Sequence, residues 1–228
     1  MFSTLKDKLP LIITILVLIV AISALAWFGW ARANEKKVLE AKKDELNVSW
    51  INGPSDAKVL VEIFVDFQCS HCKDFTKDIE PKLVSEFSNQ SVRFELKHFP
   101  IFPNSITLAE AAEAAGSQGK FWEYHDKMFE NFGNLTSTKL IEIASEIGLD
   151  VEKFKSDTSN HKFRGDVNAD KDKGNLYNIQ GTPSIAVNGK IVNVKTDYFK
   201  DISNAINAGL GKESTTQVSS TTTKVGDL

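Results

Sequence analysis

Two cysteines three positions apart, set between a strand and a helix, constrain this chain more than any other feature of its sequence. Cys69 and Cys72 are its only cysteines, and a disulfide that closes so short a loop stabilises little, because it removes little chain entropy. The preceding run, 59–65, is apolar and β-branched, which predicts a buried strand. Apolar residues recur at helical spacing over 72–87, which predicts a helix kinked by Pro81. The pair is therefore either chemically active or an accident of sequence.

The position of the two cysteines favours chemistry. A cysteine at a helix N-terminus lies beside unpaired backbone N–H groups and the positive end of the helix dipole, and both favour the thiolate. Since the thiolate is the nucleophile of disulfide exchange, Cys69 is the predicted catalytic nucleophile and Cys72, one turn further, the predicted resolving thiol. Ser70 and His71 lie between them and are expected to tune the acidity of Cys69, His71 by a hydrogen bond or its positive charge. A stabilised thiolate makes the disulfide more oxidising.

Other classes of site find less support in the sequence. A tetrahedral zinc site needs four ligands, and His98, His125 and His161 show no ligand spacing, so we expect no metal. The formal net charge of −3 and the pI of about 5.9 argue against a nucleic-acid binder that relies on phosphate contacts. With 42% hydrophobic and 25% charged residues, the composition is that of a globular protein.

The N-terminal region differs from the rest of the chain. Residues 9–31 carry no charged side chain, and as a helix of about 34 Å they would cross a hydrocarbon core of about 30 Å. We predict an uncleaved transmembrane anchor. The alternative is a signal peptide cleaved near Ala24-Leu25-Ala26, although its apolar region would be unusually long. Charge does not decide the orientation, because long domains translocate largely regardless of flanking lysines and arginines.

The predicted organisation has five parts. These are a cytoplasmic N-terminus (1–8), the anchor (9–31), a charged helical stalk (32–47), a folded domain (48–212) and a disordered Ser/Thr-rich tail (213–228). Within the domain, alternation predicts a second strand over 92–97, and the signal from about 105 to 176 is helical, with helices over 107–117, 121–132 and 138–147. Residues 184–194 predict a hairpin with an Asn-Gly turn, and a last helix follows over 197–209. The fold class is α/β.

A second motif, Gly181-Thr182-Pro183, stands directly before the predicted hairpin. Here the sequence resembles the thioredoxin superfamily, in which a cis-proline before the corresponding strand faces the reactive cysteine. The resemblance implies that Pro183 packs against the dithiol and that the backbone of Thr182 pairs with an extended substrate. A trans-proline that merely starts a strand is the alternative, since cis X–Pro bonds are uncommon.

Further motifs narrow the resemblance. Segments 64–72, 97–100, 111–115, 118–129 and 181–183 occur in this order. Together they look like the DsbA-like thiol–disulfide oxidoreductases, in their membrane-anchored bacterial branch. The resemblance implies a thioredoxin fold with a helical insertion at about 104–176, and an enzyme of the cytoplasmic membrane with its catalytic domain outside. It implies that the enzyme introduces disulfides into exported proteins and is reoxidised by a quinone-linked membrane partner. No cofactor is expected, because the dithiol is the redox centre.

Two other functions stay open from the sequence. One is a disulfide reductase or isomerase on the same fold, and the other is a membrane-tethered binding module without catalysis.

This chain departs from the family pattern at one position, which concerns the proton of Cys72. Many thioredoxin-like enzymes have an acid six residues before the first cysteine, where this chain has Ile63. Glu62 or Asp66 could replace it, but strand alternation predicts that Glu62 points away. His98 could approach the dithiol from the side, whereas the helical spacing around His125 favours core packing.

Overall fold

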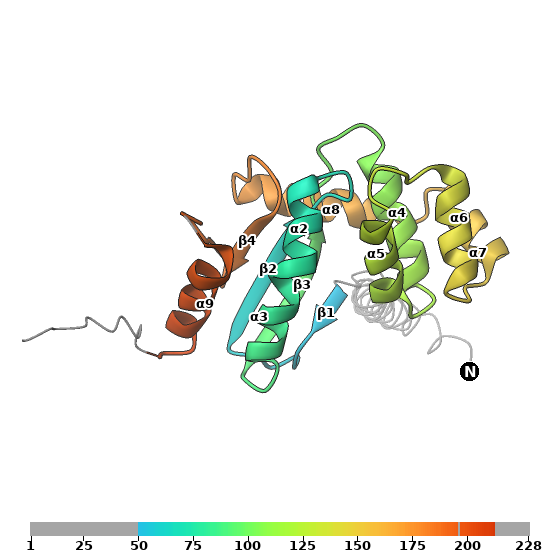
Figure 1. The fold of residues 1–228 in the computed structure, drawn as a ribbon. Helices are drawn as coiled ribbons and strands as arrows, with labels where there is room; N and C mark the ends of the chain where they lie inside the picture. Colours follow the sequence, from blue (N-terminus) through green and yellow to red (C-terminus); the bar gives the residue numbers. More distant parts are fainter. Residues whose placement is uncertain (1–49, 196, 213–228) are drawn as a thin grey trace, which may run out of the picture. The chain divides into compact units, whose positions relative to one another are not determined.

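The structure, a computed structural model, describes residues 50–195 and 197–212 (Figure 1). These residues form a sheet in the order β1-β3-β2-β4-β5, in which β2 and β3 are parallel and the other neighbours antiparallel. The strands are β1 (Trp50–Asn52), β2 (Val59–Val65), β3 (Val92–His98), β4 (Ser184–Val187) and β5 (Lys190–Ile191). The predicted α/β class is confirmed.

Helices cover both faces of this sheet. They are α2 (Ser70–Asp78), α3 (Glu80–Phe87), α4 (Ser105–Gly116), α5 (Phe121–Glu130), α6 (Ser137–Glu146), α7 (Val151–Ser159), α8 (Arg164–Leu176) and α9 (Tyr198–Gly209). In Figure 1, α2 and α3 lie in front of β2 and β3, and α8 lies behind them. Helices α4 to α8 stand between β3 and β4 in the chain, which agrees with the predicted helical block.

The predictions for the chain ends fall outside the described residues. They are the N-terminal segment (1–8), the anchor (9–31), the whole stalk (32–47), the first two residues of the domain (48–49) and the tail (213–228). Within 50–195 and 197–212, no helix is both long and apolar enough to cross a membrane. The anchor therefore stays a prediction from sequence.

Strand β2 lies in the middle of the sheet and is buried on both faces, with Glu62 as its one charged residue. Ile63, with Val61 and Val65, belongs to the main core, which also contains both cysteines. On the other face, the ring of Phe64 meets Phe99 at 6.4 Å between centroids, in a smaller cluster under α8. A strand that is buried on both sides has a nearly continuous apolar sequence, which is why β2 shows no alternation of apolar and polar residues. The cysteines follow its carboxyl end.

One predicted helix is two helices in the structure. The sequence predicted a single kinked helix over 72–87, but α2 ends at Asp78 and α3 begins at Glu80. Ile79 between them has φ −115° and ψ −53°, and Pro81 stands in the first turn of α3. Proline has no N–H to continue the ladder, but it fits well in a first turn, where that group would be unpaired. The proline thus starts a new helix instead of bending an existing one.

Strand β1 was not predicted, because three residues give too short a pattern. The indole ring of Trp50 stacks on the ring of Phe121, with 4.1 Å between the ring centroids. The indole N–H of Trp50 donates a hydrogen bond to the Glu113 carboxylate at 2.8 Å. Trp50 also fills the space above Gly116 of α4, where an added Cβ would lie 1.7 Å from the indole ring. Glycine at this position lets the strand and the helix approach closely.

The predicted hairpin is confirmed at its turn and is shorter in its second arm. Asn188 and Gly189 have φ values of 48° and 76°, and two positive φ values are what a type I′ turn requires. Strand β5 ends at Ile191, while the prediction extended to residue 194. The carboxamide oxygen of Asn188 also accepts the N–H of Leu60 at 2.8 Å, which joins the turn to β2.

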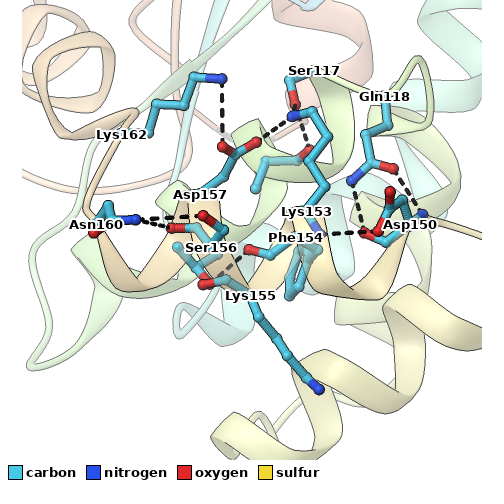
Figure 2. Close-up of polar contacts among 12 residues, drawn as sticks. Ser117, Gln118, Asp150, Lys153, Phe154, Lys155, Ser156, Asp157, Asn160 and Lys162 are labelled. Atoms are coloured by element: carbon cyan, nitrogen blue, oxygen red, sulfur yellow. Dashed lines mark hydrogen bonds and ion pairs between the residues drawn. The ribbon is translucent and has the colours of Figure 1, made fainter.

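Polar contacts join the start of α7 to the end of α4 (Figure 2). Gln118 accepts the N–H of Asp150 at 2.8 Å and donates to its carbonyl at 3.2 Å. The carboxylate of Asp150 caps α7 by accepting the N–H of Lys153 at 2.9 Å, and the Lys153 ammonium donates to Ser117 at 3.1 Å. These contacts fix the helical block as a unit beside the sheet.

Candidate functional site

The two cysteines occupy the start of α2. Cys69 is the N-cap residue, with φ −89° and ψ 119°, and its carbonyl accepts the N–H of Cys72 at 3.1 Å. Both are free thiols. Cys69 is 6% exposed and Cys72 is completely buried, so an incoming thiolate reaches Cys69 first. The predicted placement at a helix N-terminus is confirmed.

The two thiols have different surroundings. Burial raises the pKa of the Cys72 thiol, and a contact with the Thr182 side chain and a hydrogen bond from the backbone of Asp66 offset only part of this rise. Cys72 is therefore held as a neutral thiol in the dithiol form. As a leaving group it needs a proton, because a bare thiolate is poorly tolerated in this environment.

The Thr182–Pro183 motif lies against the cysteine pair, as the resemblance implied. The Thr182–Pro183 peptide bond is cis, and the Cys69 thiol donates to the Thr182 carbonyl at 3.2 Å. These residues are 113 positions apart in the chain. In the described residues, no hydrogen bond uses the Thr182 N–H, so this amide is available to another strand.

The residues between the cysteines lie in solvent. Ser70 and His71 are both exposed, and no hydrogen bond from the His71 ring to Cys69 is found among the described residues. The expected effect of these two side chains on Cys69 stays a prediction.

Neither Glu62 nor Asp66, the two acids that could replace the missing acid at position 63, is available to exchange a proton with Cys72. Glu62 accepts the Tyr177 hydroxyl at 2.8 Å and forms an ion pair with Lys173 of α8, so it points away from the dithiol, as predicted. Asp66 is 2% exposed and is fully engaged by the segment that follows β3.

Asp66 joins that segment to the cysteine loop. One carboxylate oxygen accepts the N–H groups of Ile101 and Phe102 at 2.7 and 3.2 Å. The other accepts the Ser105 hydroxyl at 2.6 Å and the Gln68 N–H at 2.8 Å. The side chains of Ile101 and Phe102 are 45% and 46% exposed. The sequence gave no signal for this role, because the donors lie 35 residues or more away, apart from Gln68.

The two histidines named from sequence lie in the core. The His98 ring shares a hydrogen bond with Glu113 at 3.0 Å and meets Phe67 at 5.9 Å between centroids. The His125 ring is surrounded by aromatic rings, with Phe129 the nearest at 5.0 Å. Core packing around His125 is confirmed, and the Phe67 ring packs against both histidines.

Two further features of the site were not predicted from the sequence. Tyr198 of α9 lies near the dithiol and packs against Phe75 of α2 at 5.8 Å between ring centroids, and burial is the main cause of its raised pKa. A pocket of about 280 Å³ lies beside the cysteine loop, lined by Phe67, Gln68 and residues 132–136. In the part of the chain that the structure describes, no group of three or more His, Cys, Asp or Glu could hold a metal ion.

Comparisons with known proteins agree with this geometry. A family model described as thioredoxin matches residues 46–208. The Na(+)/H(+) antiporter NhaA 1 of Salinispora arenicola is 33% identical over 61% of this chain, but the chain spans only 22% of that protein. The disulfide bond formation protein D of Bacillus subtilis is 31% identical over 64% of this chain and 70% of its own length. The crystal structure of oxidised BdbD from Bacillus subtilis superimposes with a TM-score of 0.66 at 28% identity, over 74% of this chain and 95% of that one.

Proposed function

Because this chain belongs to the thioredoxin family, and within it to the DsbA-like thiol–disulfide oxidoreductases, we propose that it introduces disulfides into exported proteins through Cys69 and Cys72. The observation that carries the proposal is the contact between the nearly buried Cys69 thiol and the Thr182 carbonyl, at 3.2 Å beside a cis-proline. It joins the reactive sulfur to a backbone edge on which an extended peptide can lie.

The reaction is a pair of thiol–disulfide exchanges. A substrate thiolate attacks the Cys69 sulfur, the Cys69–Cys72 bond breaks, and Cys72 leaves and takes up a proton. A second substrate thiolate then attacks the substrate sulfur of the mixed disulfide and releases the Cys69 thiolate. Two electrons pass from the substrate to the enzyme, and the substrate gains a disulfide. The redox centre is the dithiol, so the proposal needs no bound cofactor.

The direction of the reaction is supported by the start of α2. The Cys69 sulfur sits at a helix N-terminus, where unpaired amides and the helix dipole stabilise negative charge. Stabilising the thiolate of the reduced form raises the oxidising power of the disulfide. This placement supports the proposal of a disulfide donor.

Substrate recognition is proposed at three neighbouring features. The Thr182 N–H and carbonyl pair with the substrate backbone, in the manner of an added strand. The exposed Ile101 and Phe102, fixed by Asp66, and the pocket beside Phe67 and Gln68 offer apolar surface to side chains that flank a cysteine. Unfolded exported chains present such side chains in extended form.

The location follows from the chemistry. Disulfide donation needs an oxidising compartment, whereas the cytosol keeps thiols reduced. We place the catalytic domain outside the cytoplasmic membrane, tethered by the predicted anchor over 9–31, with a quinone-linked membrane protein as the reoxidant.

The test uses the oxidised full chain and a reduced peptide with two cysteines. We expect one equivalent of peptide disulfide per enzyme disulfide, formed much faster than by oxidised glutathione at the same concentration, as followed by mass spectrometry. The pre-reduced chain is the control and is expected to form none. If the chain instead accelerates the reduction of a disulfide-bonded protein by dithiothreitol and leaves the peptide reduced, it is a reductase and the proposal is wrong.

A further inference from the structure

A cavity of about 180 Å³ lies between the sheet and helices α2, α3 and α5. The strands contribute apolar side chains to its wall, apart from Asn52 of β1, and the helices contribute both polar side chains and the apolar Pro81, Val84 and Trp122. The residues used below are Ile63, Phe94 and Leu96 from the strands and Thr76, Glu80 and His125 from the helices. We call this space the Glu80 cavity.

The polar atoms of the Glu80 cavity lack partners. Thr76 Oγ1, Glu80 Oε2 and His125 Nε2 are buried, and none has a hydrogen-bond partner in the described part of the chain. Glu80 is 7% exposed and His125 is 1% exposed. Buried polar atoms are nearly always hydrogen-bonded in folded proteins. A pocket of this size has room for water, and water bound beside these three groups would give each of them a partner.

The cavity borders α2, the helix that carries the buried thiol. Cys72 and Thr76 are four residues apart on α2, so they lie on one face of the helix with Cβ atoms about 5–6 Å apart. Ile63 lines the cavity from β2 and belongs to the same core cluster as Cys72. Glu62 and Asp66 are engaged elsewhere, and the carboxylate of Glu113 binds Trp50 and His98. Of the two carboxyl groups that line the cavity, Asp126 is 66% exposed at its side chain and Glu80 is the buried one.

We propose that Glu80 exchanges the proton of Cys72, through the Thr76 hydroxyl and water in the Glu80 cavity. The proposal rests on the proposed function and deepens it. Glu80 acts through other groups, so it is a positioning residue for the proton and not a catalytic residue.

The proton moves in both halves of the cycle. When a substrate thiolate opens the Cys69–Cys72 disulfide, the carboxylic acid of Glu80 gives its proton through Thr76 and water to the departing Cys72 sulfur, and Glu80 becomes a carboxylate. On reoxidation, Cys72 loses the proton to Glu80 and attacks the mixed disulfide between Cys69 and the reoxidant. The Thr76 hydroxyl both donates and accepts, as a relay requires.

The surroundings of Glu80 suit this exchange. Burial raises its pKa, and the charge of His125 and a contact with the Thr76 side chain oppose part of the rise, while Asp126 adds to it. Both neighbours come from α5. The strands present apolar side chains to the cavity, apart from Asn52 of β1, and α2 presents Thr76 there, with Lys73 and Lys77 lining an adjoining groove. A carboxyl group in this setting is protonated closer to neutral pH than an exposed one, so it can both give and take a proton.

The first test is the rate at which glutathione opens the enzyme disulfide, measured by stopped flow between pH 5 and pH 8 on the full chain. Glu80→Gln keeps the shape but cannot transfer a proton, and we expect the rate to fall about tenfold or more, with loss of the pH dependence below neutrality. Glu80→Asp restores part of the rate. Glu86→Gln, on the exposed side of the same helix, serves as the matched control and reacts like the wild type.

The second test does not depend on turnover. The infrared difference spectrum between the oxidised and the dithiothreitol-reduced full chain is expected to show a change in a protonated carboxyl band, which Glu80→Gln removes and Glu86→Gln leaves. A wild-type chain with no such band change overturns the proposal, and so does a folded Glu80→Gln chain with the wild-type pH–rate profile. If glutathione opens the disulfide in a Glu80-dependent way but the chain oxidises no peptide, the proposed function fails and this assignment stands.

Discussion

Replacing Cys69 with Ser is expected to lower the rate of disulfide exchange to the uncatalysed background. Cys69 is the more exposed cysteine of the pair, and its thiol donates to the Thr182 carbonyl. A hydroxyl at this position offers neither a nucleophile nor a disulfide. The measurement is the transfer of the disulfide to a reduced two-cysteine peptide, with circular dichroism to verify that the variant is folded.

Cys72→Ser is the matched variant, and its expected behaviour differs. The Cys69 thiol remains, but no second thiol can displace a bound partner, so mixed disulfides with Cys69 accumulate and are visible on non-reducing gels. Trapping by Cys69→Ser alone would show that the roles of the two cysteines are reversed, and equal trapping by the two variants would show that their roles are not distinct.

Asp66→Ala is expected to give the largest loss of stability among single changes near the site. The carboxylate accepts hydrogen bonds from four donors in two segments, the N–H groups of Gln68, Ile101 and Phe102 and the Ser105 hydroxyl. We expect the free energy of unfolding to fall by about 2–4 kcal/mol, because each buried donor left without a partner costs about 1–3 kcal/mol. Urea denaturation measures this.

The control for Asp66→Ala is Asp56→Ala, in the exposed loop before β2. Surface changes of this kind alter stability by about 0.5 kcal/mol or less. The account of Asp66 as the link between the two segments fails if both variants unfold at the same urea concentration.

Local pattern was sufficient to predict most of the elements. The apolar run of β2, the alternation of β3 and the Asn188-Gly189 turn each encode their structure within a few neighbouring residues. The cysteine pair was predicted for the same reason, since a strand, two cysteines and a helix follow one another directly. Pro183 required the family resemblance, because nothing local places it beside a cysteine more than a hundred residues earlier.

Other features depend on contacts between distant segments, and local pattern does not encode them. Strand β1 is three residues long and is held by β3 and by the packing of Trp50. A proline in the first turn of a helix starts that helix, whereas a proline in its middle kinks it. The spacing of apolar residues over 72–87 fits both cases, so it did not predict the break at Ile79. Tyr198 reaches the dithiol from the last helix.

The Glu80 cavity shows this limit most clearly. Its wall comes from three strands and three helices, and in the sequence Glu80 is one acidic residue among many on a helical face. Its burial becomes visible only when β2, α2 and α5 are assembled. From the sequence, no acceptor for the proton of Cys72 was evident, because Ile63 stands where related enzymes have an acid. The fold supplies Glu80 of α3 as a candidate.

The reduction potential of the Cys69–Cys72 pair tests the central claim most directly. It is measured on the full chain by equilibration with mixtures of reduced and oxidised glutathione. Thioredoxin has a potential of about −270 mV and DsbA about −120 mV, a difference of about 7 kcal/mol for two electrons. A disulfide donor with Cys69 at a helix N-terminus is predicted to lie above about −180 mV, the value for protein disulfide isomerase. A potential near that of thioredoxin would contradict the account and assign this chain to disulfide reduction.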